Sequence, residues 1–503
     1  MIVAFLMQIV TIILSFVCRT IFANLLSKEY LGLSGLFTNI ISVLSLSELG
    51  IGSVIIVNLY KPLANNDQEQ ICKLMRFYKN AYHIIGVLVI LCGVVLTPLI
   101  HFLVKTDTNI PYLKIYFLMF ILQAASSYFF SYKQALLTAS QNEYICSIVR
   151  QIFNIAMNAL QILFLLLTKN YFAYLIISIL TNLGTNLTFS IITDKKFPFL
   201  RTIKGVKIEK HEKKKMFSNV FSMMVHKVGN VVINSTDNIL ISTFVGIVYA
   251  GLYSNYILII NAVTQVITIA LGAVSASIGD FNAQKSDEEV KELYDALQLF
   301  SMWVFGMGAI CFCVLFQPTI KVWLGEEFLL SFDVVLVCSL NFLFSGLFRV
   351  PSTFVDVTGL YRKTKFKPLA MAGINLAVSL ILVHYLGLVG IFLGTLVCYL
   401  AIGIWVDPYY LYKYKFKQAF YKYWLQLLLD FIIIVVIGVA VGFIVGLIPF
   451  YIIKVVACGI LTNLLFLIYL LFTKKKAFKY ILIRIKGLFT AKKKKQETEM
   501  EDK

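Results

Sequence analysis

Three ionisable side chains lie inside otherwise apolar stretches of the sequence: Arg19, Glu48 and Asp237. A charged side chain at membrane depth is costly, so it usually faces a bundle interior or a wet cavity and has a partner. A guanidinium can bind an anionic group through two parallel hydrogen bonds, whereas a carboxylate can bind a proton or a cation. We therefore expect a polar cavity in which Arg19 attracts an anionic cargo and Glu48 or Asp237 binds a coupling ion. The alternative is a permanent ion-pair network that only holds the helices together.

Four more residues are candidates for the same cavity. Lys227 and Arg349 lie nearer the inner ends of their apolar stretches, where they could receive a charged headgroup, or simply extend to the membrane interface. Asn39 and Asn255 belong to a set of amides scattered through these stretches. Amides can recognise sugars in a wet cavity, but they also form hydrogen bonds between packed helices. Both interpretations stay open for these residues.

The composition of the chain indicates the class of protein. Of 503 residues, 59% are hydrophobic and only 14% are charged, whereas soluble domains carry roughly a quarter charged residues. The net charge of +19 does not indicate nucleic-acid binding, because the Lys and Arg residues cluster in short connections between apolar stretches, as the positive-inside rule predicts. We predict a polytopic membrane protein that binds no nucleic acid.

Fourteen membrane spans can be drawn from stretches of about 20 apolar residues. Most Lys and Arg residues fall on one side of the membrane if the N-terminus is cytoplasmic, which predicts that both termini lie in the cytoplasm. The predicted spans are 3–26, 34–57, 82–104, 113–137, 145–168, 171–193, 217–244, 249–276, 295–317, 331–355, 368–386, 388–406, 424–445 and 451–473.

A weak internal repeat organises these spans. Tyr30-x-Gly32-Leu33 returns as Tyr249-x-Gly251-Leu252, each time between the first and second span of a half. Both halves run in the same direction, which indicates a parallel repeat about an axis along the membrane normal. This symmetry predicts that Arg19 and Asp237 face each other across a central cleft. The predicted domains are an N-terminal six-helix bundle (1–193), a basic cytoplasmic linker (194–216), a second six-helix bundle (217–406), two additional helices (407–473) and a basic amphipathic tail (474–503).

Smaller features complete the organisation. Gly438, Gly442 and Gly446 form a small-residue stripe, which we expect to pack against the last span. The basic tail is predicted to lie on anionic membrane lipids. Nine cysteines lack metal-ligand spacing, so we expect no disulfide, no metal and no cofactor. The chain begins directly in apolar sequence with no basic n-region and no cleavage site, so we predict a span instead of a signal peptide, and we expect the natural chain to begin further upstream.

Several motifs together resemble a family. They are Arg19-Thr20-Ile21-Phe22, Glu29-Tyr30-Leu31-Gly32-Leu33, Glu48-Leu49-Gly50-Ile51-Gly52, Tyr60-Lys61-Pro62-Leu63, Asp237-Asn238-Ile239-Leu240-Ile241 and Gly251-Leu252-Tyr253-Ser254-Asn255-Tyr256. They resemble bacterial polysaccharide flippases, the Wzx-type members of the multidrug/oligosaccharidyl-lipid/polysaccharide exporter superfamily. The resemblance implies translocation of undecaprenyl-pyrophosphate-linked oligosaccharide across the cytoplasmic membrane for capsule, O-antigen or exopolysaccharide assembly. It also implies a polysaccharide polymerase and glycosyltransferases as partners.

The alternatives differ in cargo or in class. A multidrug or cation antiporter and a peptidoglycan-precursor flippase of the same superfamily would share the bundles, although an antiporter should have a more acidic lumen. A membrane enzyme of polysaccharide assembly would usually present a sizeable loop with acidic residues, and the loops here are short. The sequence also has no HExxH and no GxxxxGK[ST] motif. We therefore predict a transporter that works by alternating access, and not an enzyme.

Overall fold

All regular elements that the computed structural model describes are helices. It describes residues 2–45, 51–106, 110–203, 229, 231–233 and 235–473. Twelve helices in these residues are long and apolar enough to cross a membrane. Of two shorter apolar helices, Val54–Ala64 begins at the end of the predicted second span and continues beyond it, and Val231–Val245 coincides with the end of the predicted seventh span. The prediction of an all-α polytopic membrane protein is confirmed, and the count of fourteen is approximately right.

The second predicted span differs in detail, because two helices cover it. One ends at Leu44 and the next begins at Ile51. Residues 46–50, which include Glu48, lie outside the described residues, as do Lys227 and the tail from 474 onward.

The chain divides into two compact units by its internal contacts. The first unit comprises Met1–Asn255 and Pro368–Ile391, and the second comprises Tyr256–Lys367 and Phe392–Lys503. The first unit therefore takes in segments that we assigned to the second predicted bundle, and the predicted domain boundaries stay a prediction.

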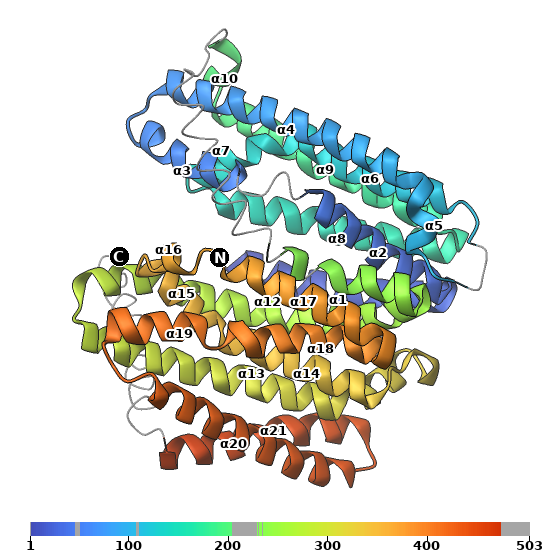
Figure 1. Cartoon of the computed structure of the whole chain (residues 1–503). Coiled ribbons are helices and arrows are strands. Elements are labelled where there is room, and N and C mark those ends of the chain that lie inside the picture. The colour runs from blue at the N-terminus through green and yellow to red at the C-terminus, as the bar shows by residue number, and fades with distance from the viewer. Residues whose placement is uncertain are drawn as a thin grey trace, which may run out of the picture. The chain divides into compact units, whose positions relative to one another are not determined.

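The first unit contains most of the N-terminal helices (Figure 1). In chain order they are α1 (Ile2–Leu25), α2 (Lys28–Leu44), α3 (Ile51–Ala64), α4 (Gln68–Leu96), α5 (Ile100–Leu103), α6 (Leu113–Phe130), α7 (Gln134–Ala139), α8 (Glu143–Thr168), α9 (Tyr171–Lys196) and α10 (Phe199–Thr202), then the π-helical turn Ile241–Val245, the start of α12 (Ile247–Gln284), α17 (Lys367–Leu386) and the start of α18 (Leu388–Cys398). The pairs α1–α8, α8–α9, α4–α6 and α6–α9 pack side by side.

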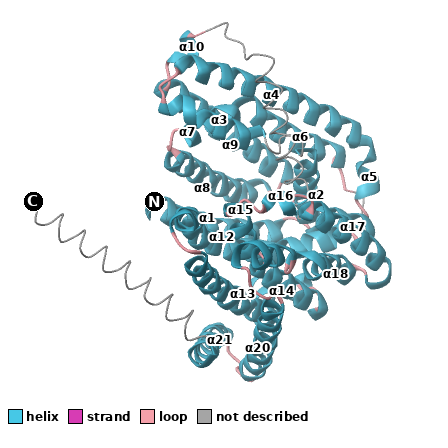
Figure 2. Ribbon diagram, turned by 60° about the vertical axis from the view of Figure 1, so that its left-hand side comes forward, coloured by secondary structure: helices cyan, strands magenta, loops and turns pink. Residues whose placement is uncertain are grey.

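The second unit is built around one long helix, α13. Its elements are the rest of α12, α13 (Asp287–Trp323), α14 (Phe332–Leu347), α15 (Arg349–Val357), α16 (Tyr361–Thr364), the end of α18, α19 (Val406–Tyr410), α20 (Tyr421–Gly446) and α21 (Tyr451–Thr473), with π-helical turns at Tyr399–Gly403 and Leu411–Phe416. Helix α13 packs against α14, α20 and α21, and Figures 1 and 2 both show α20 and α21 beside it.

Local sequence signals set where the long helices begin. At the start of α13, the Ser286 hydroxyl accepts a hydrogen bond from the backbone N–H of Glu289, and the Glu289 carboxylate accepts one from the Ser286 N–H. This capping box satisfies two of the amide groups that a helix start leaves unpaired. Helix α4 begins in a related way, because Asp67 accepts a hydrogen bond from the Gln70 N–H. Polar caps therefore mark two helix starts in a largely apolar chain.

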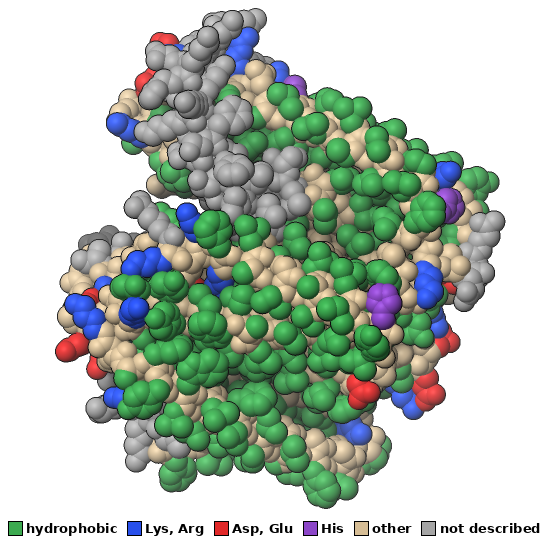
Figure 3. Space-filling model, viewed as in Figure 1, with side chains coloured by type: hydrophobic (Ala, Val, Ile, Leu, Met, Phe, Trp, Pro, Cys, Tyr) green, Lys and Arg blue, Asp and Glu red, His purple; other side chains and the backbone are tan. Residues whose placement is uncertain are grey.

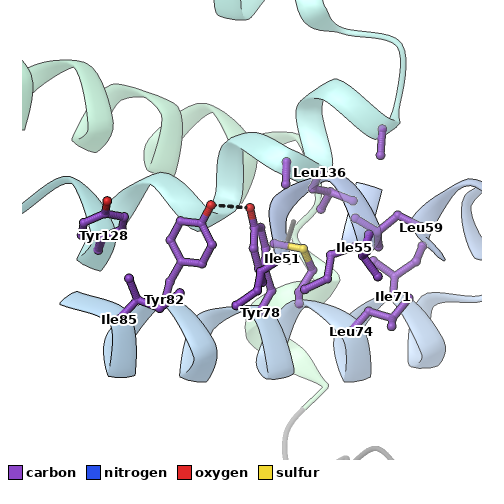
Figure 4. Packing of buried hydrophobic residues seen from close by; sticks show 14 of the residues in the cluster. Ile51, Ile55, Leu59, Ile71, Leu74, Tyr78, Tyr82, Ile85, Tyr128 and Leu136 are labelled. Carbon is purple, nitrogen blue, oxygen red and sulfur yellow. Dashed lines mark hydrogen bonds between the residues drawn. The ribbon is translucent and has the colours of Figure 1, made fainter. Parts of the chain in front are cut away.

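The core of the first unit includes a cluster of α3, α4 and α7, with Tyr128 from α6 (Figure 4). The Tyr78 hydroxyl donates to the Tyr82 hydroxyl at 2.9 Å within it. Gly52 lies against this pair, because a Cβ there would be 2.9 Å from the Tyr78 oxygen. The glycine that follows the Glu48 segment therefore permits a close approach of α3 to α4.

The outer surface is apolar over the long faces of the helices. Figure 3 shows hydrophobic side chains covering the middle of the helices of the second unit, whereas charged side chains gather toward the helix ends. Large hydrophobic side chains such as Val439 and Phe443 are exposed on α20. Such an apolar belt fits a chain whose surface faces lipid.

Candidate functional site

Arg19 is held in the first unit by a neutral group. Its side chain is half-buried on α1, and one terminal nitrogen donates a 2.7 Å hydrogen bond to the hydroxyl of Ser254 on α12. The same hydroxyl donates to the Gly251 carbonyl at 2.6 Å, so its lone pairs are left to accept from Arg19. Among the described residues no carboxylate pairs with this guanidinium. That Arg19 and Asp237 face each other across a central cleft, as the repeat suggested, stays a prediction.

Most of the hydrogen-bonding capacity of Arg19 remains unused. A guanidinium has five N–H donors, and in the described structure only the contact to Ser254 occupies one. The Nε atom is buried without a partner. An unpaired buried donor of this kind usually has an ion, a water or a ligand as its partner. The hydrogen bond to Ser254 thus holds one terminal nitrogen of the Arg19 guanidinium, and its other N–H donors are available to bind an anionic group.

Close backbone packing brings Ser254 to Arg19. Gly251 precedes Ser254 by one helical turn, and a Cβ on Gly251 would lie 2.3 Å from the Lys28 carbonyl oxygen on α2. On the opposite side, a Cβ on Gly32 would lie 2.0 Å from the Ile247 carbonyl oxygen. Only glycine permits both approaches without a shift of the backbone. The two glycines of the sequence repeat therefore place α12 close enough for its serine to contact Arg19.

Asn255 follows Ser254 and is completely buried. Neither its amide nitrogen nor its amide oxygen has a hydrogen-bond partner in the described structure. Buried amides without partners are uncommon, because each unsatisfied group costs about 1–3 kcal/mol. Asn238 has an unpaired buried oxygen as well, and its amide nitrogen lies 3.9 Å from the position of a Cβ on Gly35 of α2. The first unit thus contains several buried polar atoms that lack protein partners.

The other predicted site residues separate into three cases. Asp237 is half-buried on the short apolar helix of the seventh span. Asn39 is half-buried, but its amide donates to the Gly35 carbonyl of its own helix at 2.8 Å, which fits a structural role. Glu48 and Lys227 lie outside the described residues, so their roles stay predictions.

Arg349 belongs to the second unit and contacts its own surroundings there. It begins α15, donates a 2.6 Å hydrogen bond to the Thr268 hydroxyl of α12, and lies 6.0 Å from the centre of the Phe305 ring of α13. These contacts join α15 to two neighbouring helices. Thr268 is therefore a hydrogen-bond partner of Arg349 within the second unit.

The sequence analysis did not find two ion pairs, one half-buried and one buried. In the first unit Lys133 bonds to Asp194 at 2.5 Å and to the Ser190 hydroxyl at 2.9 Å. In the second unit Lys367 pairs with Asp407, and both side chains are buried. The carboxylates lie near the ends of the sixth and twelfth predicted spans, and this common position is the signal that could have found them. Whether an ionisable residue at a helix end is buried depends on tertiary packing.

The amides between helices mostly serve packing. The Gln161 amide on α8 donates to the Ser178 hydroxyl of α9 at 2.7 Å, and its oxygen lies 3.7 Å from the Cys18 sulfur of α1. These contacts fit interhelical hydrogen bonding better than sugar recognition. The described residues contain no group of His, Cys, Asp and Glu side chains that could hold a metal ion.

Comparisons with known proteins place the chain in a family. The family model described as polysaccharide biosynthesis protein matches residues 1–276. No curated protein matches the sequence. Among solved structures, the chain is similar to the lipid II flippase MurJ in an inward closed conformation, with a TM-score of 0.68 at 16% identity, covering 94% of this chain and 99% of MurJ.

Two multidrug transporters are similar as well. A MATE family transporter of the MOP superfamily in an inward-facing conformation has a TM-score of 0.59 at 13% identity, covering 78% of this chain and 93% of its own. The MATE multidrug transporter DinF-BH has a TM-score of 0.59 at 15% identity, covering 83% of this chain and 96% of its own. The TM-scores establish a shared fold. The predicted resemblance is thereby confirmed: the chain belongs to the polysaccharide biosynthesis protein family and has the fold of MOP superfamily transporters.

Proposed function

We propose that this protein is a flippase for undecaprenyl-pyrophosphate-linked oligosaccharide in the bacterial cytoplasmic membrane, and not an enzyme. The cargo headgroup would cross a polar cavity by alternating access, while the lipid tail stays in the bilayer. The observation that carries the proposal is Arg19, a guanidinium within an apolar span that is anchored by the neutral Ser254 hydroxyl and has a buried Nε without a partner.

The charge of Arg19 favours an anionic cargo over a cationic one. An unneutralised guanidinium repels organic cations and can bind a pyrophosphate through two parallel hydrogen bonds. The unpaired amide of Asn255, next to Ser254 in sequence, supplies a donor and an acceptor of the kind that sugar hydroxyls need. We therefore place the pyrophosphate at Arg19 and the adjoining sugars toward Asn255, with Glu48, Asp237 and Lys227 of the same unit as the further proposed cavity residues.

The experiment is a flipping assay in reconstituted vesicles. The probe is undecaprenyl-pyrophosphate-linked oligosaccharide with a nitrobenzoxadiazole label on the sugar, and membrane-impermeant dithionite reports the leaflet in which it lies. Arg19→Ala should slow flipping about tenfold to a hundredfold, the range that a hydrogen bond to a charged group contributes. Arg19→Lys should keep part of the activity, because the charge survives but the two-pronged geometry does not.

The matched control is Arg76→Ala, because Arg76 is an exposed arginine of α4. It should leave flipping unchanged. Normal flipping by a correctly inserted Arg19→Ala variant would refute the cationic site. If the wild type leaves the labelled oligosaccharide in place but exports a cationic dye, the protein is a multidrug antiporter instead.

A further inference from the structure

The second unit contains an apolar groove between α14 and α20, which we call the α14–α20 groove. Its volume is about 510 Å³, within the range of roughly 300–1,000 Å³ typical of ligand pockets. Helix α13 forms its floor, where Ile310 is buried, and α14 and α20 form its walls. Gly438, Gly442 and Gly446 of α20 line the groove. Because glycine has no side-chain carbon, the α20 wall, which we call the low glycine wall, does not project into the groove at these positions.

The glycine stripe therefore has a different role from the one expected. We predicted that it packs against the last span, but the atoms within 4 Å of a Cβ at Gly438 and Gly442 belong to Ile310 and Val314 of α13. A Cβ at Gly446 would have no neighbour within 4 Å. That prediction was wrong, because the stripe faces α13 and the groove, and α20 meets α21 through another face.

The groove opens sideways onto the lipid-facing surface. Phe332 and Leu336 on the α14 wall are exposed, and so are Val435 and Val439 on the α20 wall. The bottom is buried, as Leu343 and Val445 show. In a bilayer this opening faces acyl chains, and the apolar lining disfavours water, which needs polar partners to occupy a cavity. A hydrocarbon chain is the natural occupant of such a groove.

One end of the groove carries a positive charge. Lys454, in the first turn of α21, is the one charged residue among the described residues that line it. It is half-buried, and its ammonium has no hydrogen-bond or ion-pair partner in the described part of the chain. Along α20 the lining runs from Phe431 to Gly446, about 22 Å at 1.5 Å per residue. That length exceeds the roughly 15 Å hydrocarbon depth of one leaflet, so a whole acyl chain can lie in the groove with its headgroup at Lys454.

We propose that the α14–α20 groove is a binding site for an anionic phospholipid, with one acyl chain in the groove and the phosphate on Lys454. Hydrocarbon alone gives little selectivity, because the surrounding lipid is equally apolar. The ammonium would therefore set the preference for an anionic headgroup, and the low glycine wall would admit the chain. On the predicted topology Lys454 lies at the outer face, so the lipid would come from the outer leaflet. The site does not depend on which cargo the protein moves.

The test is native mass spectrometry of the delipidated full-length protein titrated with phosphatidylglycerol or phosphatidylcholine. The wild type should retain one phosphatidylglycerol tightly. Lys454→Gln should weaken phosphatidylglycerol binding about fivefold, the factor that one lysine contributes near an anionic surface, and leave phosphatidylcholine unchanged. The control Lys321→Gln removes a lysine that already pairs with Glu326 and should change neither.

Filling the groove tests the acyl chain separately. Gly442→Leu should remove the tightly bound lipid, whereas Gly459→Leu on α21, outside the groove and with no neighbour near its Cβ, should not. Gly446→Leu provides a second filling variant where Gly442→Leu is unstable. Equal retention by wild type and both filling variants, or an unchanged headgroup preference in Lys454→Gln, would overturn the proposal. One-for-one displacement by undecaprenyl phosphate would overturn it as well, since the occupant would then be the tail of a polyprenyl lipid. The lipid-binding measurement and the flipping assay have separate readouts, so either proposal can fail without the other.

Discussion

Gly32 and Gly251 contact each other's helices reciprocally. A Cβ on Gly32 would meet the carbonyl oxygen of Ile247, four residues before Gly251, and a Cβ on Gly251 would meet the carbonyl oxygen of Lys28, four residues before Gly32. The same two positions are the glycines of the internal repeat. A contact in which each partner presents the same surface is what a two-fold relationship produces. The reciprocal contact therefore supports the parallel repeat that the sequence suggested.

Adding a methyl group at either glycine should destabilise the first unit. Gly32→Ala and Gly251→Ala should each lower stability by about 1–3 kcal/mol, because a carbonyl oxygen already occupies the position of the new Cβ. Thermal unfolding in detergent should show a lower Tm for both variants. Gly373→Ala on α17 is the control, since a Cβ there meets nothing within 4 Å. A Gly32→Ala protein as stable as this control would contradict the contact.

We expect Ser254 to affect flipping by positioning the Arg19 guanidinium. Ser254→Ala removes the acceptor at 2.7 Å but leaves the guanidinium in place, so flipping should fall less than in Arg19→Ala. A double-mutant cycle of Arg19→Lys with Ser254→Ala should show non-additive effects, as expected of residues in direct contact. The readout is the initial flipping rate in vesicles containing equal amounts of protein. Purely additive losses would show that the serine does not position Arg19.

The buried pair of Lys367 and Asp407 should matter more for stability than an exposed pair. Lys367→Met should cost about 3–5 kcal/mol, because it leaves the buried carboxylate without a partner. The double variant Lys367→Met with Asp407→Leu should recover much of that loss. Lys321→Met, which breaks an exposed pair with Glu326, should cost at most about 1 kcal/mol. Equal losses in Lys367→Met and Lys321→Met, measured by thermal unfolding, would argue against burial of the first pair.

Coupling to an ion is proposed for Glu48 and Asp237. If either carboxylate binds a proton or Na⁺ in one access state and releases it in the other, an imposed gradient should accelerate flipping. Glu48→Gln or Asp237→Asn should then abolish the response to the gradient. Gradient-independent flipping by the wild type would reject coupling. If the wild type responds and both variants respond equally well, other residues carry the ion.

The orientation of the chain across the membrane is predicted from the distribution of its Lys and Arg residues. In a variant without native cysteines, a cysteine introduced near Asn109 should react with an impermeant maleimide added outside, and one near Lys210 should not. Both positions lie outside the described residues, so the labelling tests the charge pattern alone. The reverse labelling pattern would invert the proposed topology.

The sequence by itself determined the class of the protein, the approximate helices and the position of Arg19 within the first span. Span length and the cost of a charge in the membrane are properties of a short stretch of chain, so they can be read without knowing what the stretch contacts. The family followed from motifs that are equally local.

Only the tertiary structure shows which side chains and which helix faces contact each other. Arg19 and Ser254 are separated by 235 positions, and no local pattern indicates that this serine contacts the guanidinium. The glycine stripe of α20 was assigned to α21, the next helix in the chain, although it faces α13. The ion pairs of Lys133 with Asp194 and of Lys367 with Asp407 join positions 61 and 40 residues apart, and no local pattern indicated either pair. In each case the answer depends on which helix faces meet, and in a chain that is apolar on nearly all sides the hydrophobic pattern alone does not distinguish those faces.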